Sequence, residues 1–221
     1  MRPMPFVTLQ PHGQQVAVNN IFCIGRNYAA HAAELGNRVE ETPLVFIKPT
    51  SALLPVGQPI QLPSFSKDVH YETELVVLIG QGGKHIPEAA ALQHIAGYAV
   101  GLDLTARDLQ SAAKAKGLPW TLAKGFDGAA CVSDFQPVSA IADITQARFS
   151  MSLNGVSRQQ GNTAMMLFPV AYLIHYLSTV FTLQPGDLIY TGTPEGVGPL
   201  QAGDALQLSL EDRTLAEFVV A

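Results

Sequence analysis

Acidic residues at alternate positions of a predicted strand are the first candidates for chemistry. Residues 70–80 read His-Tyr-Glu-Thr-Glu-Leu-Val-Val-Leu-Ile-Gly, and the two-residue period of a strand places His70, Glu72 and Glu74 on one face. Beyond Glu74 the strand is apolar on both faces, which predicts that its second half is buried. The two carboxylates would then lie about 7 Å apart at the edge of a core. A divalent cation would offset the cost of burying these like charges, whereas a solvated strand face would need no ion.

A histidine and a glutamate three residues apart follow a second predicted strand, at 21–25. The alanine-rich segment after it favours a helix that Asn27 would cap and Gly36 would end. On that helix His31 and Glu34 would be neighbours on one face. A histidine oriented by a carboxylate is the usual form of a general base, whereas a surface pair on a short helix would have no catalytic role.

A third acid, Asp103, ends the apolar strand predicted over 95–103. The residues that follow, Thr105 to Asp108, have the pattern of a capping box that opens a helix over 106–116. Thr105 is the better cap of that helix. Asp103 is then left without a structural role and becomes a further candidate ligand.

Two lysines and a glycine-rich loop could supply positive charge or backbone donors. Lys48 ends a strand predicted over 44–49 and either points into a cleft or faces solvent. Lys124 lies between an apolar run and a glycine, as either a buried cation or a surface residue. In the loop 189–199, glycines would let backbone N–H groups approach an anion, and an ordinary loop is the alternative.

The composition limits the class of protein. A chain of 221 residues, 48% of them hydrophobic, suits one large domain with a short arm, and residues 1–19 have the pattern of an arm with a small hairpin. The net charge of −5 and the lack of a basic cluster argue against nucleic acid or an anionic membrane as a partner. No apolar run reaches the roughly 18 residues of a membrane helix, and no signal peptide is recognisable. With two distant cysteines, we expect a cytoplasmic protein.

The hydrophobic periods favour strands over helices. The dipeptide Asn154-Gly155 lies between two alternating segments, which is a strong signal for a two-residue hairpin. Residues 163–183 are the longest helical candidate, and a shorter helix is predicted over 87–94. With about four short helices, the sequence indicates a β-rich α+β fold.

Six segments together resemble the fumarylacetoacetate hydrolase family, and in particular its short single-domain acylpyruvate hydrolase and oxaloacetate decarboxylase type. In chain order they are GRNYAAHAAE (25–34), FIKP (46–49), HYETEL (70–75), LDLTARDLQ (102–110), GLPWTLAK (117–124) and TGTPEGVGP (191–199). Each segment alone is only modest evidence for the family, but the combination and order of the six segments are highly specific for it. The resemblance implies a catalytic domain over 20–221 with the mixed β-sandwich roll of this family, a few short helices and a homodimer.

The resemblance also assigns roles to the residues singled out above. It implies an Mg²⁺ or Mn²⁺ site built from Glu72, Glu74 and Asp103, and a catalytic pair, His31 and Glu34, on a mobile lid helix. It places further residues around the substrate, namely Lys124 as a catalytic residue and Gln110, Thr193, Arg26 and Lys48 as substrate-binding residues. Tyrosine follows His70 where many relatives have a second histidine. We expect the loops 36–44 and 155–163 to form the wall of the pocket.

The reaction that the resemblance implies is cleavage of an acylpyruvate by water into a carboxylate and pyruvate. His31 would deprotonate a water that attacks the 4-keto carbon, the C3–C4 bond would break, and the metal and Lys124 would stabilise the pyruvate enolate. Decarboxylation of oxaloacetate needs the same enolate but no water. Two alternatives remain: an isomerase, decarboxylase or hydratase of 2-oxo-diene dioates in aromatic catabolism, and a non-catalytic binding protein. The presence of His31 and the three acids argues against the latter.

Overall fold

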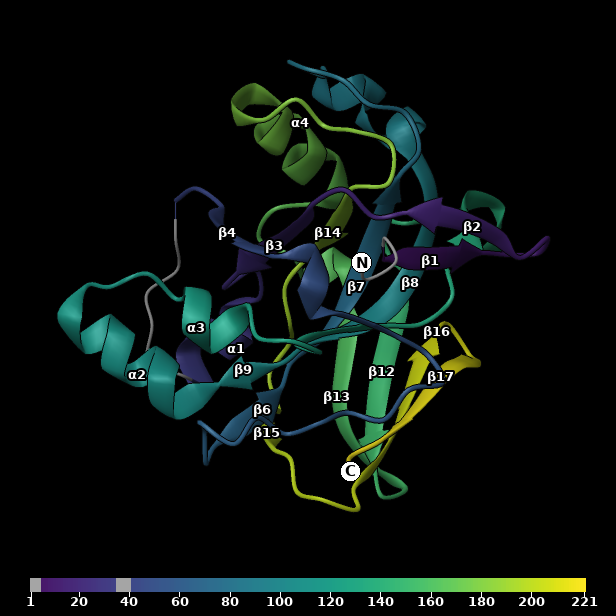
Figure 1. Ribbon diagram of the computed structural model, residues 1–221. Coiled ribbons are helices and arrows are strands. Elements are labelled where there is room, and N and C mark those ends of the chain that lie inside the picture. Colours follow the sequence, from purple (N-terminus) through teal and green to yellow (C-terminus); the bar gives the residue numbers. More distant parts are fainter. Residues whose placement is uncertain (1–4, 35–40) are drawn as a thin grey trace.

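A mixed eight-stranded sheet runs through the protein and carries several of the residues predicted for the site (Figure 1). The computed structural model describes residues 5–34 and 41–221. The strand order is β4-β3-β14-β7-β8-β10-β5, and β11 pairs with β8 as well. The strands of this sheet are β3 (Ile21–Gly25), β4 (Leu44–Lys48), β5 (Leu53–Pro55), β7 (Thr73–Ile79), β8 (Ile95–Asp103), β10 (Ala130–Val132), β11 (Gln136–Pro137) and β14 (Leu188–Tyr190). The sheet is mixed because β14 runs parallel to β3 and antiparallel to β7.

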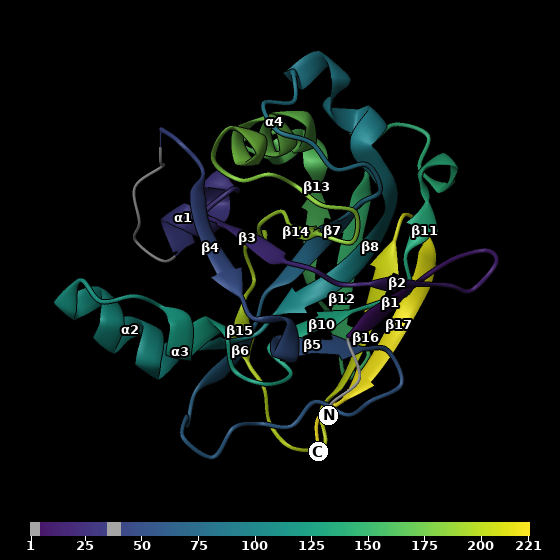
Figure 2. The same ribbon diagram turned by 45° about the horizontal axis from the view of Figure 1, so that its top comes forward.

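A four-stranded antiparallel sheet lies beside the central sheet (Figure 2). Its strands, in spatial order, are β13 (Val156–Asn162), β12 (Arg148–Leu153), β16 (Ala205–Leu210) and β17 (Arg213–Val219). Alternate residues of β12 and β16, among them Phe149, Met151 and Leu208, are buried. One face of this sheet therefore packs on the core, as is usual for an antiparallel sheet with one solvated face. The strand-rich α+β class predicted from the sequence is confirmed.

Shorter elements cover the ends and edges of the two sheets. A hairpin of β1 (Phe6–Leu9) and β2 (Gln14–Ala17) and a three-stranded sheet of β15 (Gly198–Pro199), β6 (Val69–Tyr71) and β9 (Thr105–Ala106) add strands. The α-helices are α1 (Ala29–Glu34), α2 (Arg107–Lys116), α3 (Thr121–Lys124) and α4 (Val170–Val180), and the 3-10 helices are η1 (Thr50–Ala52), η2 (Glu88–His94), η3 (Val138–Ala140) and η4 (Thr163–Met165). Figure 1 shows α2 and α3 projecting from one side and α4 at one end. Val7 and Val18 of the N-terminal segment are buried in the common core, and a boundary at residue 20 stays a prediction.

The antiparallel pair β7–β8 determines where the acidic residues lie. Every residue of β7 is buried, which confirms the prediction made from its two apolar faces. The register pairs Glu74 with Gly101 and Thr73 with Leu102. At the end of β8, the Asp103 N–H donates to the Glu72 carbonyl oxygen at 2.8 Å. The pairing therefore brings the three acids to the same end of these two strands.

The strand predicted over 70–80 is interrupted at Glu72. β6 ends at Tyr71 and pairs with β9 and β15, whereas β7 begins at Thr73 and belongs to the central sheet. The chain changes sheets between them, so the prediction of one continuous strand is wrong. His70 lies in β6, and its Nε2 is 2.9 Å from Asp68 Oδ1 rather than near the other acids.

Two side chains predicted to cap helices have tertiary partners. The Thr105 hydroxyl donates to Glu72 Oε1 at 3.0 Å, and the N-cap position of α2 is Ala106, without a side-chain cap. The Thr105 capping prediction is therefore wrong, because a buried carboxylate competes for the hydroxyl. The Asn27 side chain donates to the Phe168 carbonyl oxygen and accepts from its N–H group.

Other local signals had mixed outcomes. The segment predicted as one helix over 163–183 contains η4 and α4, and α4 begins only after Pro169. The predicted end of α2 at Gly117 is confirmed, with this residue in the left-handed region at φ 64°. The Asn154-Gly155 turn that joins β12 to β13 is also confirmed. Gly36, predicted to end the first helix, lies outside the described residues.

None of the described helices is long and apolar enough to cross a membrane.

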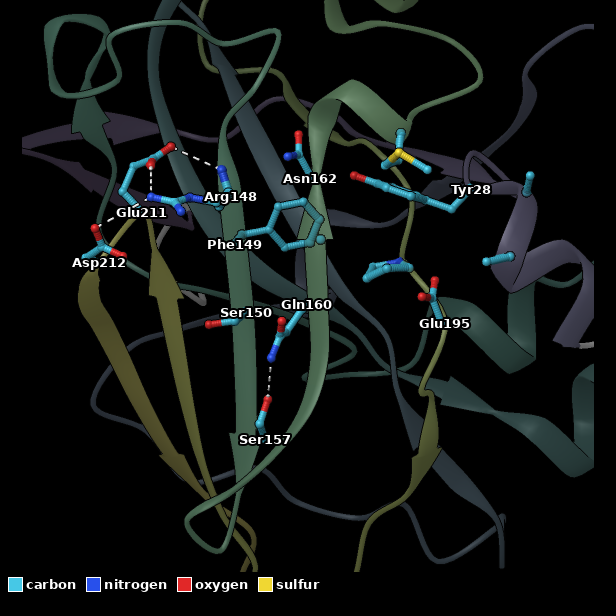
Figure 3. Close-up of a pocket in the computed structure, with 15 residues that line it drawn as sticks. Tyr28, Arg148, Phe149, Ser150, Ser157, Gln160, Asn162, Glu195, Glu211 and Asp212 are labelled. Carbon is cyan, nitrogen blue, oxygen red and sulfur yellow. Dashed lines mark hydrogen bonds and ion pairs between the residues drawn. The ribbon is translucent and has the colours of Figure 1, made fainter.

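A wide cleft lies over β12 and β13, next to α1 (Figure 3). Tyr28 and Gln160 are among the residues that line it. Its carboxylates include Glu211 and Asp212, which lie 3.8 and 3.6 Å from Arg148 Nη2. Residues from the segment 155–163, predicted as part of the pocket wall, line this cleft, but none of the described residues predicted as catalytic, substrate-binding or metal-binding does. The candidate site therefore lies elsewhere.

Substitution of Gly101 tests the close packing of β8 against its neighbours. A Cβ atom there would lie 2.5 Å from the Cys131 carbonyl oxygen, 2.8 Å from Tyr190 Cε1 and 2.9 Å from Val76 Cγ2. We expect Gly101→Ala to lower the free energy of unfolding by about 1–3 kcal/mol, measured by urea denaturation. Gly25→Ala, whose new Cβ would meet the mobile end of Leu44 at 3.0 Å, should cost less. Equal losses in both variants would contradict this account.

Candidate active site

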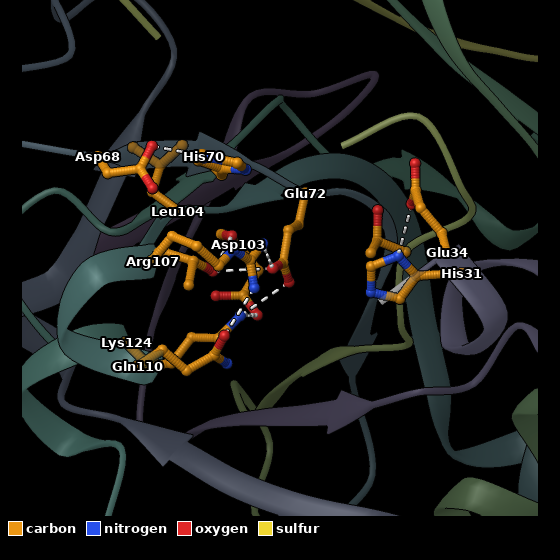
Figure 4. Close-up of polar contacts among 12 residues, drawn as sticks. His31, Glu34, Asp68, His70, Glu72, Asp103, Leu104, Arg107, Gln110 and Lys124 are labelled. Carbon is orange, nitrogen blue, oxygen red and sulfur yellow. Dashed lines mark hydrogen bonds and ion pairs between the residues drawn. The ribbon is translucent and has the colours of Figure 1, made fainter. Parts of the chain in front are cut away.

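Three carboxylates meet where β7 and β8 approach the link from β6 (Figure 4). Glu72 lies in that link, Glu74 is the second residue of β7, and Asp103 is the last residue of β8. One oxygen atom from each lies within 4.8 Å of the other two, and the three residues are only 1–5% exposed. The structure therefore brings together the three acids predicted as metal ligands.

Three buried or nearly buried cations contact two of these carboxylates. Lys124 Nζ donates to Glu72 Oε2 at 2.8 Å and to Asp103 Oδ2 at 2.7 Å. Lys48 Nζ lies 2.7 Å from Asp103 Oδ1, and Arg107 Nη2 donates to Glu72 Oε1 at 2.5 Å. Of the two alternatives given for Lys124, the structure shows the buried cation and not the surface residue. These pairs offset the charge on Glu72 and Asp103.

The pKa values of the paired groups follow from this network. Burial alone would raise the pKa of Glu72, but Lys124 and Arg107 outweigh it and hold that pKa well below its usual range. Burial alone would lower the pKa of Lys124, but Asp103 and Glu72 outweigh it and hold that pKa above its usual range. Glu72 is therefore ionised and Lys124 is charged at neutral pH.

Glu74 is in a different position from the other two acids. Its carboxylate accepts a hydrogen bond from the Gly192 N–H at 2.7 Å. In the part of the chain that the structure describes, no Lys, Arg or His forms an ion pair with it. Burial and the neighbouring Asp103 raise the pKa of Glu74 well above its usual range. A buried carboxylate beside two others and without a cation of its own fits a divalent metal ion, which prefers hard oxygen ligands.

The cavity beside the carboxylates is rich in positive charge. Glu72 and Glu74 line it, and so do four cationic side chains, namely Arg26, Arg107, Lys114 and Lys124. The cations outnumber the carboxylates in this lining, and an excess of one sign of charge raises the local concentration of ligands of the opposite sign. The charge of the cavity therefore favours an anionic ligand next to the acids.

His31 and Glu34 lie on the other side of Glu72 from Gln110 and Lys124 (Figure 4). His31 Nδ1 is 3.3 Å from Glu34 Oε2, and His31 is 4% exposed and lines the cavity. The other oxygen of Glu34 accepts from the Gly196 N–H at 3.0 Å. The pair predicted from its i, i+3 spacing therefore forms, and it places an imidazole at the cavity.

The predicted substrate-binding residues have different surroundings. Gln110 and Thr193 are buried and line the cavity, as does Arg26. Lys48 is 1% exposed and is held behind Asp103, where it also donates to the carbonyl oxygens of Leu104 and Lys124. Neither sequence interpretation of Lys48 is correct, because it neither faces solvent nor lines the cavity.

Two further residues contact the predicted site residues but were not predicted from the sequence. The first is Arg107, whose Nη1 donates to Gln110 Oε1 at 2.6 Å. Gln159 lies in β13, where a loop over 155–163 was predicted, and this prediction is wrong. Its side chain accepts from the Thr73 N–H at 2.9 Å and donates to Thr193 Oγ1 at 2.9 Å. The alternation around the Asn154-Gly155 turn was the signal that could have placed Gln159 on a buried strand face.

Comparison with known proteins identifies the family. Residues 20–220 match the family described as "Fumarylacetoacetate (FAA) hydrolase C-terminal", and the chain belongs to this family. The family resemblance and the fold predicted from the sequence are therefore confirmed.

The most similar proteins include enzymes of oxaloacetate and of a related 2-oxo acid. The chain is 46% identical over 201 residues, 91% of either chain, to mouse "Oxaloacetate tautomerase FAHD1, mitochondrial". It is 45% identical over 204 residues, 92% of this chain and 93% of the other, to "Oxaloacetate tautomerase YcgM" of Escherichia coli. It superposes with a TM-score of 0.91 and 39% identity on the fumarylpyruvate hydrolase of Pseudomonas aeruginosa in complex with Mn²⁺ and pyruvate, over 100% of this chain and 99% of the other.

Replacing Glu74 by Gln should remove one pH dependence from the stability of the metal-free protein. The folded pKa of Glu74 lies above its unfolded value of about 4.3, so the folded state holds this proton more tightly. The contribution of this proton to the free energy of unfolding is complete below the unfolded pKa of Glu74, and it is lost as the pH rises through the folded pKa. Urea unfolding with a chelator should show a contribution of at most about 1.4 kcal/mol per pH unit in the wild type that Glu74→Gln lacks.

The exposed Glu217 provides the matched control for this measurement. Glu217→Gln should keep the pH dependence of the wild type. If Glu74→Gln keeps it too, the carboxyl group of Glu74 is not the group that titrates.

Proposed function

We propose that this chain is a divalent-metal-dependent enzyme that converts small 2-oxo acids through an enolate, with the keto–enol tautomerisation of oxaloacetate as its main reaction. The observation that carries the proposal is Glu74, a buried carboxylate that forms no ion pair with a described Lys, Arg or His, next to two others at a cavity lined by cations. The names of the mouse and Escherichia coli relatives favour oxaloacetate as the substrate.

Glu72, Glu74 and Asp103 would hold the ion, for which we propose Mg²⁺ or Mn²⁺. When bound, it supplies a Lewis acid that stabilises negative charge on the oxygen atoms of a 2-oxo acid. The donor set consists of hard carboxylate oxygens, as both ions prefer. The Mn²⁺ and pyruvate held by the Pseudomonas aeruginosa enzyme support this assignment.

The side chains around the cavity would bind and orient the substrate. Because Gln110 Oε1 accepts from Arg107, its amide NH₂ group is left to donate to a substrate oxygen. Because Thr193 Oγ1 accepts from Gln159, its hydroxyl proton is likewise left to donate. The charges of Arg107 and Lys124, held in place by Glu72, favour a substrate whose negative charge grows as the enolate forms.

His31 would move the proton. With Nδ1 donating to Glu34, the other ring nitrogen, Nε2, is the acceptor that faces the reaction. In tautomerisation, Nε2 takes a proton from C3 of oxaloacetate, the C–H electron pair forms the C2–C3 double bond, and the oxo group becomes an enolate oxygen. A proton from the imidazolium or from water then binds to this oxygen to give the enol, and the reverse sequence restores the keto form. Glu34 fixes the tautomer and stabilises the imidazolium between the two steps.

Hydrolysis of acylpyruvates is the second candidate, favoured by the likeness to the fumarylpyruvate hydrolase. In this reaction Nε2 of His31 takes a proton from water, the hydroxide attacks the 4-keto carbon, and the C3–C4 bond breaks to leave a carboxylic acid and a pyruvate enolate. Decarboxylation of oxaloacetate forms the same enolate by loss of CO₂ and needs no base. The homodimer and the cytoplasmic location remain proposals as well.

A test of the metal site uses stability and turnover together. Mg²⁺ or Mn²⁺ at about 100 times its Kd should stabilise the wild type by about 2.7 kcal/mol, seen as a higher Tm. Glu74→Gln should lose this stabilisation and bind the ion at least about tenfold more weakly. Oxaloacetate tautomerisation, followed by ultraviolet absorbance, should fall in parallel. Glu217→Gln is the control, and a Glu74→Gln variant that binds metal and turns over normally would contradict the site.

Replacing His31 by Ala separates the reactions that need a base from the one that does not. We expect tautomerisation of oxaloacetate and hydrolysis of acetylpyruvate to fall by about 10²- to 10⁴-fold, and decarboxylation of oxaloacetate to fall much less. The exposed His12 supplies the control, His12→Ala, which should behave as the wild type. If both base-dependent rates survive in His31→Ala, the base is another residue. A 2-hydroxydienedioate in the same panel tests the isomerase alternative.

A further inference from the structure

A row of three side chains separates the catalytic cavity from a neighbouring apolar groove. The row begins at Lys124, whose Nζ is bound to two carboxylates and lies 5.1 Å from the centre of the Phe46 ring. The Phe46 ring packs edge-on against Trp120, with ring centroids 5.9 Å apart and an interplanar angle of 65°. These three residues line both the cavity and the groove. The row therefore has the acids on one side and the groove on the other.

The two sides of this row differ in chemistry. The cavity side carries the cations described above. The groove lies between β4 and the segment joining α2 to α3, and α3 contacts β4. Its further lining is mainly apolar, from Leu44, Val45, Ile47, Leu118 and Pro119. An alkyl chain would lose contact with water in the groove, whereas a carboxylate would be better placed on the cavity side.

We propose that Phe46 and Trp120 form a wall that limits the length of the acyl group the site accepts, and that Trp120 is the specificity-determining residue. This inference rests on the proposed function and names its substrate class, short 2-oxo acids with a polar distal end. With the indole in place, the cavity ends at the wall. Without it, the cavity continues into the groove and admits a 2-oxo acid with an alkyl tail.

Trp120 can be replaced without opening the core. Phe46 and Trp120 are both half-buried, and neither belongs to the set of buried core residues. The expected change in Kd depends on how many methylene groups of the alkyl tail enter the groove. Each methylene group that leaves water improves Kd about fourfold, so two such groups are enough for about a tenfold change.

The experiment compares the affinities of pyruvate and 2-oxooctanoate by calorimetry with Mn²⁺ present. The measured quantity is the ratio of the 2-oxooctanoate Kd to the pyruvate Kd. This ratio should fall at least about tenfold in Trp120→Ala and less in Trp120→Phe. The matched control is Leu122→Ala, because Leu122 is 76% exposed on α3 and lines neither the cavity nor the groove. Its ratio should equal that of the wild type.

A double variant tests whether the tail occupies the groove. Leu118 lines the groove and is 55% exposed, so Leu118→Glu places a charge there without disturbing the core. In the Trp120→Ala background it should cancel the gain for 2-oxooctanoate and leave pyruvate binding unchanged. The proposed role of the wall would be contradicted by an unchanged Kd ratio in Trp120→Ala. It would also be contradicted if the gain in 2-oxooctanoate affinity persisted after Leu118→Glu.

Oxaloacetate turnover of the same samples separates this inference from the proposed function. If the wild type does not convert oxaloacetate but the Kd ratio still falls in Trp120→Ala, the proposed reaction is wrong and the proposed role of the wall is supported. If turnover is normal and the Kd ratio does not change, only the proposed role of the wall is wrong. If the metal-loaded wild type binds neither 2-oxo acid, both are overturned.

Discussion

The burial of three carboxylates in one place is the constraint on which the rest of this structure depends. Each buried charge costs several kcal/mol unless it is paired and hydrogen-bonded. Lys48, Lys124 and Arg107 supply that pairing from three different elements, β4, α3 and the start of α2. The cations are themselves largely buried, so each group of charges requires the other. Glu74 forms no ion pair with any of these three cations, and we propose on this ground that the cluster is a functional site rather than a stabilising one.

The residues of the site come from two parts of the fold. The acids lie in or beside the central sheet, and His31 belongs to the short helix α1. The acids lie on or beside β7 and β8, two long strands in which all residues but one are buried, and packing holds their positions closely. His31 lies on α1, a helix of six residues, which Glu34 ties to the loop after β14 through the Gly196 N–H. In the proposed reaction, charge stabilisation thus depends on the central sheet, and proton transfer depends on one short helix.

The reactions in the names of the relatives all pass through an enolate of a 2-oxo acid. Tautomerisation, decarboxylation and C–C hydrolysis differ in what happens at C3 and beyond it, while each places negative charge on the same 2-oxo acid oxygens. Residues that face those oxygens therefore serve all three reactions. We propose that the choice among them depends on His31 as the base and on Phe46 and Trp120, which lie between the polar cavity and the apolar groove.

The sequence by itself determined the features that consecutive residues encode. The two apolar faces of 75–79 predicted a buried strand, Asn154-Gly155 predicted a hairpin, and the order of short motifs indicated the family, its fold and its three acids. Only the tertiary structure decided the partners of those acids: Lys48 behind Asp103, and the Thr105 hydroxyl on Glu72 rather than on a helix end. Contacts of this kind join residues more than thirty positions apart. A local pattern records which side chains can bond, but the chain path through two sheets determines which of them meet.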